Sequence, residues 1–236
     1  MSTNERIDKL KELDKEIRER YSDGSIQPIF DGAFDPLYYF DKAKHRTLWL
    51  MKEPYEVGER TGGWSFSDWF LQDQLDFHSV LLRGPSSKTW RSIAYITFGI
   101  NHGVFDYQSM PDLSLDHQSA GELRSAAFVN IQKRPSVTGS FTIMRNITEA
   151  YRQNGDIIRR QIELLDPHII ICAYTSGVIS KDFPVQDMQI VNSAGCYRHA
   201  NKLIVDAYHP ATRDLSIETY VNDILSCIRL FSGLFD

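Results

Sequence analysis

The hydrophobic and polar residues of the chain follow two kinds of pattern. Residues 4–21 place apolar side chains at helical spacing among charged ones, and the turn Ser22-Asp23-Gly24 follows, so we expect an amphipathic helix there. Further helices are expected at 64–83, 88–100, 145–165 and about 216–231. In the segment 145–165, Asn154-Gly155 marks a point where the helix can break.

Four short apolar runs have the composition of buried strands, at 46–52, 125–131, 168–174 and 202–207. The first ends at Glu53-Pro54, because proline cannot continue a hydrogen-bonded ladder. Strands that alternate with helices pair in parallel, and helices then cover both faces of the sheet. We therefore expect one domain over 1–236, with a three-layer α/β/α fold around a central, mainly parallel sheet. Ligands of such folds bind beyond the carboxyl ends of the strands.

Composition narrows the class of protein. No apolar run approaches the roughly 20 residues that a membrane helix needs, and the charged N-terminal segment does not resemble a secretory signal. We therefore expect a cytoplasmic protein with no membrane partner. The three cysteines, Cys172, Cys196 and Cys227, form neither a CxxC pair nor a four-cysteine cluster. We expect no metal site and no cofactor.

The formal net charge is −5 at pH 7. Proteins that bind nucleic acid tightly and without sequence preference usually carry a basic surplus, so this charge argues against that class. It remains compatible with a local basic groove. Lys133 and Arg134 follow an apolar strand and are candidates for phosphate contacts, although a solvated loop fits them equally well.

Polar residues follow three of the expected strands. Glu53 comes after the first strand, Asn130 at the end of the second and His209 after the last. A carboxylate, an amide and an imidazole that meet at one edge of a sheet form a plausible catalytic set. Capping of the strand ends explains the same residues equally well, because polar residues are common in loops.

In this order of motifs the chain resembles the uracil-DNA glycosylase superfamily. The shared features are a carboxylate-Pro-Tyr after the first strand, an apolar strand that ends in Asn, and a late His-Pro-small turn. The stretch EPYEVGERTGGWSFS at 53–67 is similar to the family-one sequence Asp-Pro-Tyr-His followed, at the same spacing, by Gly-x-x-Phe-Ser. The resemblance runs from about residue 46 onward and implies the fold of that superfamily.

The resemblance also implies roles for particular residues. Glu53 corresponds to the catalytic carboxylate, which stabilises the sugar cation or positions water when an N-glycosidic bond breaks. His209 corresponds to the histidine that hydrogen bonds the departing base. Three residues correspond to base-binding positions: Tyr55 as the pocket tyrosine, Phe66 as the stacking ring and Asn130 as the base-reading amide. Flipped DNA bases are the implied substrate, and DNA is the implied partner.

The chain departs from the family pattern at several positions. Met51 and Lys52 replace the usual glycine and glutamine before the carboxylate, and Glu56 replaces the histidine after the tyrosine. Arg213 lies near the place where the family inserts an apolar wedge into DNA, which makes it a further DNA-contact candidate.

Two alternative functions stay open. Lys52, Glu56 and the negative net charge suggest a member of the fold that binds nucleic acid or a nucleotide without catalysis. A small-molecule hydrolase that uses His209 is the other alternative, with Ser176 as nucleophile and Asp206 as the third residue. The chain has no GxSxG motif, and Asp206 should point away from His209 if the strand continues.

Overall fold

A computed structural model of the chain describes residues 1–56, 61–68, 86–113, 115, 121–136 and 142–231. Its helices are α1 (Thr3–Arg20), α2 (Pro36–Asp41), α5 (Ser87–His102), α7 (Met144–Leu165), α8 (Ser176–Ile179) and α9 (Ile217–Arg229), with 3-10 turns at Tyr107–Ser109 and Gly121–Ser125. Its strands are β1 (Thr47–Met51), β2 (Ala126–Asn130), β3 (Ile169–Ala173), β4 (Gln189–Val191), β5 (Ala194–His199) and β6 (Lys202–Ala207).

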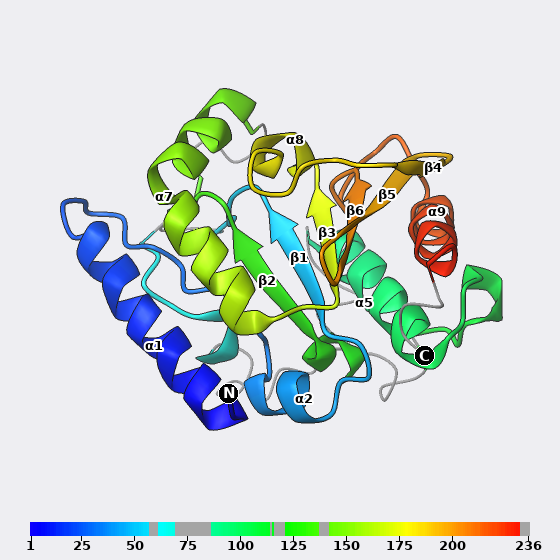
Figure 1. The fold of residues 1–236 in the computed structure, drawn as a ribbon, viewed down its shortest axis with the longest axis horizontal. Helices are drawn as coiled ribbons and strands as arrows, with labels where there is room; N and C mark the ends of the chain where they lie inside the picture. Colours follow the sequence, from blue (N-terminus) through cyan, green and yellow to red (C-terminus); the bar gives the residue numbers. More distant parts are fainter. Residues whose placement is uncertain (57–60, 69–85, 114, 116–120, 137–141, 232–236) are drawn as a thin grey trace.

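The strands form one six-stranded sheet in the order β2-β1-β3-β6-β5-β4. β1 pairs in parallel with β2 and β3, and β3 pairs in parallel with β6, so the four predicted strands are confirmed in type and in mutual direction. Their carboxyl ends therefore share one edge of the sheet, the end of the molecule at which α8 lies in Figure 1. The chain is a mixed α/β protein with a mostly parallel sheet.

Two further strands, β5 and β4, were not expected from the sequence: β5 pairs antiparallel with β6, and β4 pairs antiparallel with β5. β4 is short and largely exposed, and its Ile190 side chain is among the most exposed apolar side chains described. Such a segment lacks the run of buried β-branched residues on which strand prediction depends.

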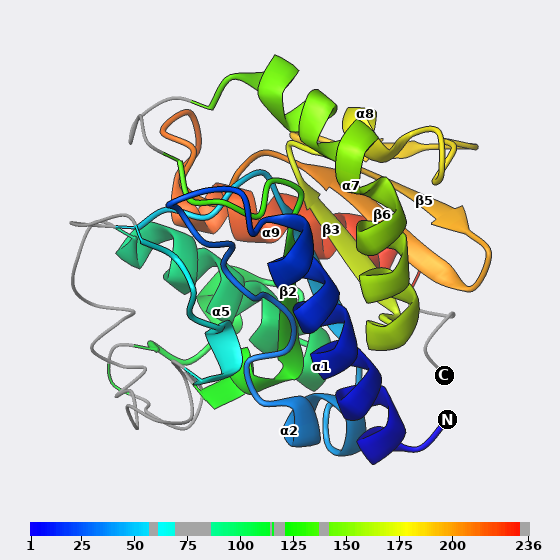
Figure 2. The ribbon, with the colours of Figure 1, turned by 90° about the vertical axis from the view of Figure 1, so that its left-hand side faces the viewer.

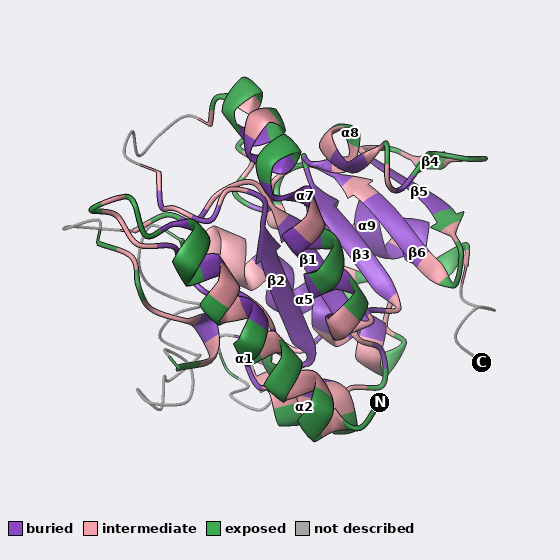
Figure 3. Cartoon of the chain, turned by 60° about the vertical axis from the view of Figure 1, so that its left-hand side comes forward, coloured by how far each residue is buried: buried purple, intermediate pink, exposed green. Residues whose placement is uncertain are grey.

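Helices cover both faces of the sheet. On one face, α5 and α9 pack on strand residues such as Trp49, Phe128 and Val205, and on the other α7 packs on Leu48, Leu50 and Ile170. α1 lies alongside α7, as Figure 2 shows, and Leu13 and Ile17 are buried between the two. Apart from β4, the strands are buried along most of their length, whereas α1 and α7 keep exposed outer faces (Figure 3).

Most of the expected helices are confirmed, with small differences. α1 begins with a capping box, in which Ser2 and Glu5 each bond the backbone N–H of the other. α7 continues through Asn154-Gly155, because the Asn154 amide donates both to the Tyr21 hydroxyl and to the Ala150 carbonyl within the helix. Of the helix expected at 64–83, residues 66–68 are helical and 69–83 lie outside the described residues. In the described part of the chain, no helix is long and apolar enough to cross a membrane.

Candidate functional site

The site predicted from the sequence lies where β2, β1, β3 and β6 end. Met51 is opposite Asn130 in the parallel register, and beyond it the Gln132 N–H donates to the Lys52 carbonyl at 2.9 Å. The segments after β1 and β2 thus run side by side. Lys52 and Glu53 are half-buried, and among the described residues no hydrogen bond or ion pair engages the Glu53 carboxylate.

His209 stands two residues beyond β6 and is half-buried. Burial and the nearby positive charge of Lys52 lower the pKa of its imidazole to about 4, so His209 is neutral at pH 7. Its Nδ1 accepts a hydrogen bond from the Ala211 N–H at 3.1 Å, which places the ring proton on Nε2. The side chain is therefore a neutral Nε2–H donor, and Lys52 links it electrostatically to the end of β1.

Three tyrosines surround this edge with exposed rings. Tyr55 follows β1, Tyr174 follows β3 and Tyr208 follows β6, and each of these residues is more than one third exposed. The rings of Tyr174 and Tyr208 are stacked, and the Lys52 ammonium lies 5.8 Å from the centre of the Tyr174 ring. Burial lowers the pKa of Lys52, and Glu53 opposes this effect.

Phe66 is not part of the exposed edge. It is 8% exposed and belongs to an aromatic cluster on the α5 side of the sheet, stacked on Phe128 with ring centres 5.7 Å apart. Phe34 and Trp90 contact the same ring. The structure thus uses Phe66 for packing, because its side chain is buried within this cluster.

Asn130 is also hydrogen bonded within the protein. Its backbone N–H and its amide nitrogen both donate to the Asp31 carboxylate, at 2.6 and 3.2 Å. Gln161 of α7 donates to the same carboxylate at 2.9 Å, and the Lys133 ammonium donates to both Asp31 and Gln161, at 2.8 and 2.7 Å. The Asp31 and Lys133 side chains are completely buried.

The prediction that Lys133 contacts DNA phosphates is therefore corrected. Its ammonium is enclosed between Asp31 and Gln161, and a phosphate outside the protein cannot reach it in this conformation. Burial lowers its pKa, and the Asp31 carboxylate opposes that change. A buried lysine needs such a partner, because taking an unpaired ammonium out of water costs roughly several kcal/mol of lost solvation.

The other two DNA-contact candidates differ from each other. Arg134 lies over the Tyr21 ring at 4.9 Å and donates to the Tyr21 carbonyl and to Asp23. Its guanidinium charge is therefore already paired with a carboxylate of the protein. Arg213 is exposed in the turn after His209 and has no ion pair with a described residue. Lys88 anchors this turn by donating to the carbonyls of Thr212 and Leu215.

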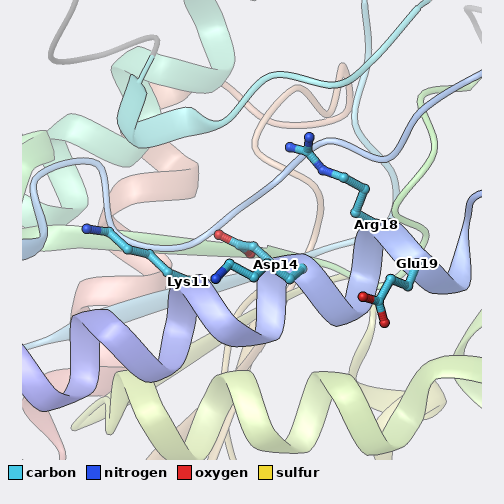
Figure 4. A pocket seen from close by; sticks show the side chains of 5 residues that line it. Lys11, Asp14, Arg18 and Glu19 are labelled. Carbon is cyan, nitrogen blue, oxygen red and sulfur yellow. The ribbon is translucent and has the colours of Figure 1, made fainter.

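A second acidic residue approaches the buried ion pair from α1. Figure 4 shows Asp14, which projects between Lys11 and Arg18 at a shallow hollow on the helix. Burial raises the pKa of the Asp14 carboxyl to about 7, and the negative charge of Asp31 adds to this effect while Lys133 opposes it.

The raised pKa makes stability depend on pH. In the unfolded chain the carboxyl ionises near 3.8 and in the folded protein near 7, so between these values the folded state binds more protons and stability falls as pH rises. We expect Asp14→Asn to be more stable than wild type at pH 8 by about 2 kcal/mol. This is about half of what the pKa shift implies at about 1.4 kcal/mol per unit, because solvent screens the charge of a side chain that is only half-buried. The difference should vanish near pH 4. Urea unfolding at the two pH values measures it, and equal differences at both would contradict it.

The hydrolase triad considered from the sequence is not assembled. The Ser176 hydroxyl donates to Asp206 at 2.7 Å, whereas His209 Nδ1 accepts from the backbone. In a triad the histidine Nδ1–H donates to the carboxylate and Nε2 accepts from the serine. Among the described residues, no group of three or more His, Cys, Asp or Glu side chains is placed to hold a metal ion.

Tyr174, Tyr208 and the Asp31 network (Asp31, Asn130, Lys133 and Gln161) were not expected from the sequence. The sequence does carry a signal for the tyrosines, because Tyr174 is the last residue of the predicted strand 168–174 and Tyr208 directly follows the predicted strand 202–207. The Asp31 network carried no local signal, since its members are far apart in the chain.

Comparisons with known proteins add no relative to this picture. A scan against protein-family models found no family that matches the chain, and a search of curated proteins found no similar sequence.

Proposed function

We propose that the protein is a uracil-DNA glycosylase-like protein that excises or recognises a flipped deaminated base such as uracil. The observation that carries the proposal is the unengaged Glu53 carboxylate at the same sheet edge as a neutral His209. These are the two groups that the sequence resemblance assigns to catalysis. Lys52 supports the arrangement, because its charge acts on His209 and lies beside Glu53 in the chain.

Each group has a defined task in this reaction. As the N-glycosidic bond breaks, the sugar becomes cationic and the base carries away the bonding electrons. The Glu53 carboxylate stabilises the sugar cation, and the His209 Nε2–H donates to the base oxygen on which negative charge develops. The Lys52 ammonium adds positive potential on the side of the departing base, where Nδ1 of His209 is already fixed by Ala211.

The second candidate is a protein that binds nucleic acid or a nucleotide without excision. Two observations favour it: the Asn130 amide nitrogen donates to Asp31, and Phe66 is buried against Phe128. Both residues would have to leave these contacts to read and stack a base in the way the resemblance implies.

Single- and double-stranded oligonucleotides that carry uracil, hypoxanthine or xanthine separate the two candidates. We expect the wild-type protein to release at least one of these bases, measured as strand cleavage at the resulting abasic site after alkali. If wild type is folded and binds these oligonucleotides but releases none of the bases, the catalytic proposal is wrong and the binding protein takes its place.

A further inference from the structure

Tyr174 and Tyr208 form a paired aromatic surface at the sheet edge. The two residues are 54% and 41% exposed, and their rings lie within 18° of parallel with centres 6.4 Å apart. Two exposed rings in this arrangement offer parallel π faces to a planar ligand. We name these two residues the tyrosine pair.

The backbone holds the tyrosine pair in place at a conformational cost. Tyr174 has a φ of 64°, a left-handed conformation that is a genuine outlier for a bulky residue. The Tyr174 N–H donates to the Ala207 carbonyl at 2.7 Å, and the Tyr220 hydroxyl donates to the Tyr208 carbonyl at 2.7 Å. Strained residues that the surroundings fix so firmly cluster at active sites, ligand clamps and switch regions.

Charge indicates what kind of planar ligand fits. The Lys52 ammonium lies 5.8 Å from the centre of the Tyr174 ring, and neither Lys52 nor Arg213 is ion-paired with a described residue. His209 directly follows Tyr208 in the chain. An aromatic surface beside the unpaired cation of Lys52 matches a nucleobase with its phosphodiester, because bases stack on aromatic side chains while phosphates meet Lys and Arg.

We propose that the tyrosine pair is a stacking site for an unpaired nucleobase of a single-stranded DNA segment. The inference rests on the proposed function for its location, because the base that stacks there neighbours the base presented to His209. It adds a preference for single-stranded over duplex DNA, since base pairing and stacking in a duplex keep the π faces covered.

Direct binding of a dT oligonucleotide tests the inference without any excision. Tyr174→Ala and Tyr208→Ala should each weaken binding by about 5- to 150-fold, the range that corresponds to the loss of one stacked base. Tyr174→Phe and Tyr208→Phe keep the rings and should bind within about 3-fold of wild type. Tyr38→Ala is the matched control, because Tyr38 lies in α2, which precedes β1 at the opposite end of the sheet.

A further variant separates binding from folding. Tyr174→Gly removes both the ring and the left-handed strain, so it should lose binding as Tyr174→Ala does while its unfolding midpoint stays at or above that of wild type. A strand of abasic sites with the same length should bind more weakly than dT, since it offers phosphates without bases. Duplex DNA of the same length should also bind more weakly.

The outcomes distinguish this inference from the proposed function. No binding of dT by wild type, equal binding of the abasic strand, or unchanged binding by both alanine variants overturns the stacking site. If the last result accompanies base excision by wild type, the glycosylase proposal stands and the stacking site falls. If the alanine variants lose dT binding but wild type excises no base, the stacking site stands and the glycosylase proposal falls.

Discussion

Replacing Lys133 by methionine is expected to destabilise the fold by about 3–5 kcal/mol, the usual cost of removing one partner of a buried ion pair. The variant leaves the Asp31 carboxylate buried without its only direct ion-pair partner among the described residues. It also leaves the Gln161 Oε1 without the hydrogen that Lys133 donates to it. Denaturant unfolding at pH 7, compared with wild type, measures the loss.

Two companion variants show whether the buried charge is the cause. In the double variant Lys133→Met with Asp31→Asn, no charge remains at the pair, and the new amide oxygen can still accept from the Asn130 backbone N–H, so part of the stability should return. Arg134→Met removes the neighbouring, partly exposed cation and should cost about 1 kcal/mol or less, as exposed ion pairs do. A loss of under about 1 kcal/mol for Lys133→Met would contradict the prediction.

The parallel sheet could be predicted because its strands leave a strong local signal. The runs in β1, β2 and β3 are buried along both faces, so they appear in the sequence as mainly apolar segments, and β6 has the apolar core Leu203–Val205. Their alternation with helical segments then determines the parallel direction. The amphipathic pattern of α1 and α9 is equally local, and the structure confirms both helices.

The roles of Lys133 and Phe66 could not be predicted, because they depend on contacts that are distant in sequence. Lys133 meets Asp31 across 102 residues, and nothing near Lys133 indicates a buried acid. Lysine is rarely buried, so a surface role was the better expectation from the sequence. Phe66 fits the family spacing, but its environment is set by Phe34, Trp90 and Phe128 from three other segments.

The rule that residues directly after parallel strands meet at one edge of the sheet predicted the position of some residues of the candidate site and missed others. It predicted that Glu53 and His209 lie at the carboxyl edge of the sheet, and they do, because parallel strands bring their carboxyl ends together. Applied to polar residues, the rule does not reach Tyr174 and Tyr208, which lie at the same edge. Tyr174 could not have been recognised as strained, since its left-handed backbone depends on the bond from its N–H to Ala207 of the neighbouring strand.

If the protein is a glycosylase, His209→Ala and Glu53→Gln should each lower kcat by about 10²–10³, the typical cost of one lost electrostatic partner of a transition state. Both side chains are only half-buried, and the Glu53 carboxylate makes no hydrogen bond or ion pair with a described residue, so the fold should persist. Single-turnover excision measures the loss, and thermal unfolding of each variant checks the fold.

Asn130→Ala should behave differently from those two variants. Its amide nitrogen donates to Asp31, so the substitution removes one donor from the buried carboxylate and should lower stability by about 1 kcal/mol or more. If the amide also reads the base edge, discrimination between uracil and cytosine should weaken together with the rate, because the favoured base loses a hydrogen bond that the other does not make. Excision of both bases by wild type and variant gives the ratio. A variant that loses stability but keeps the uracil-to-cytosine ratio of wild type would make Asn130 a structural residue, and base selection would then have to come from other residues at the edge of the sheet.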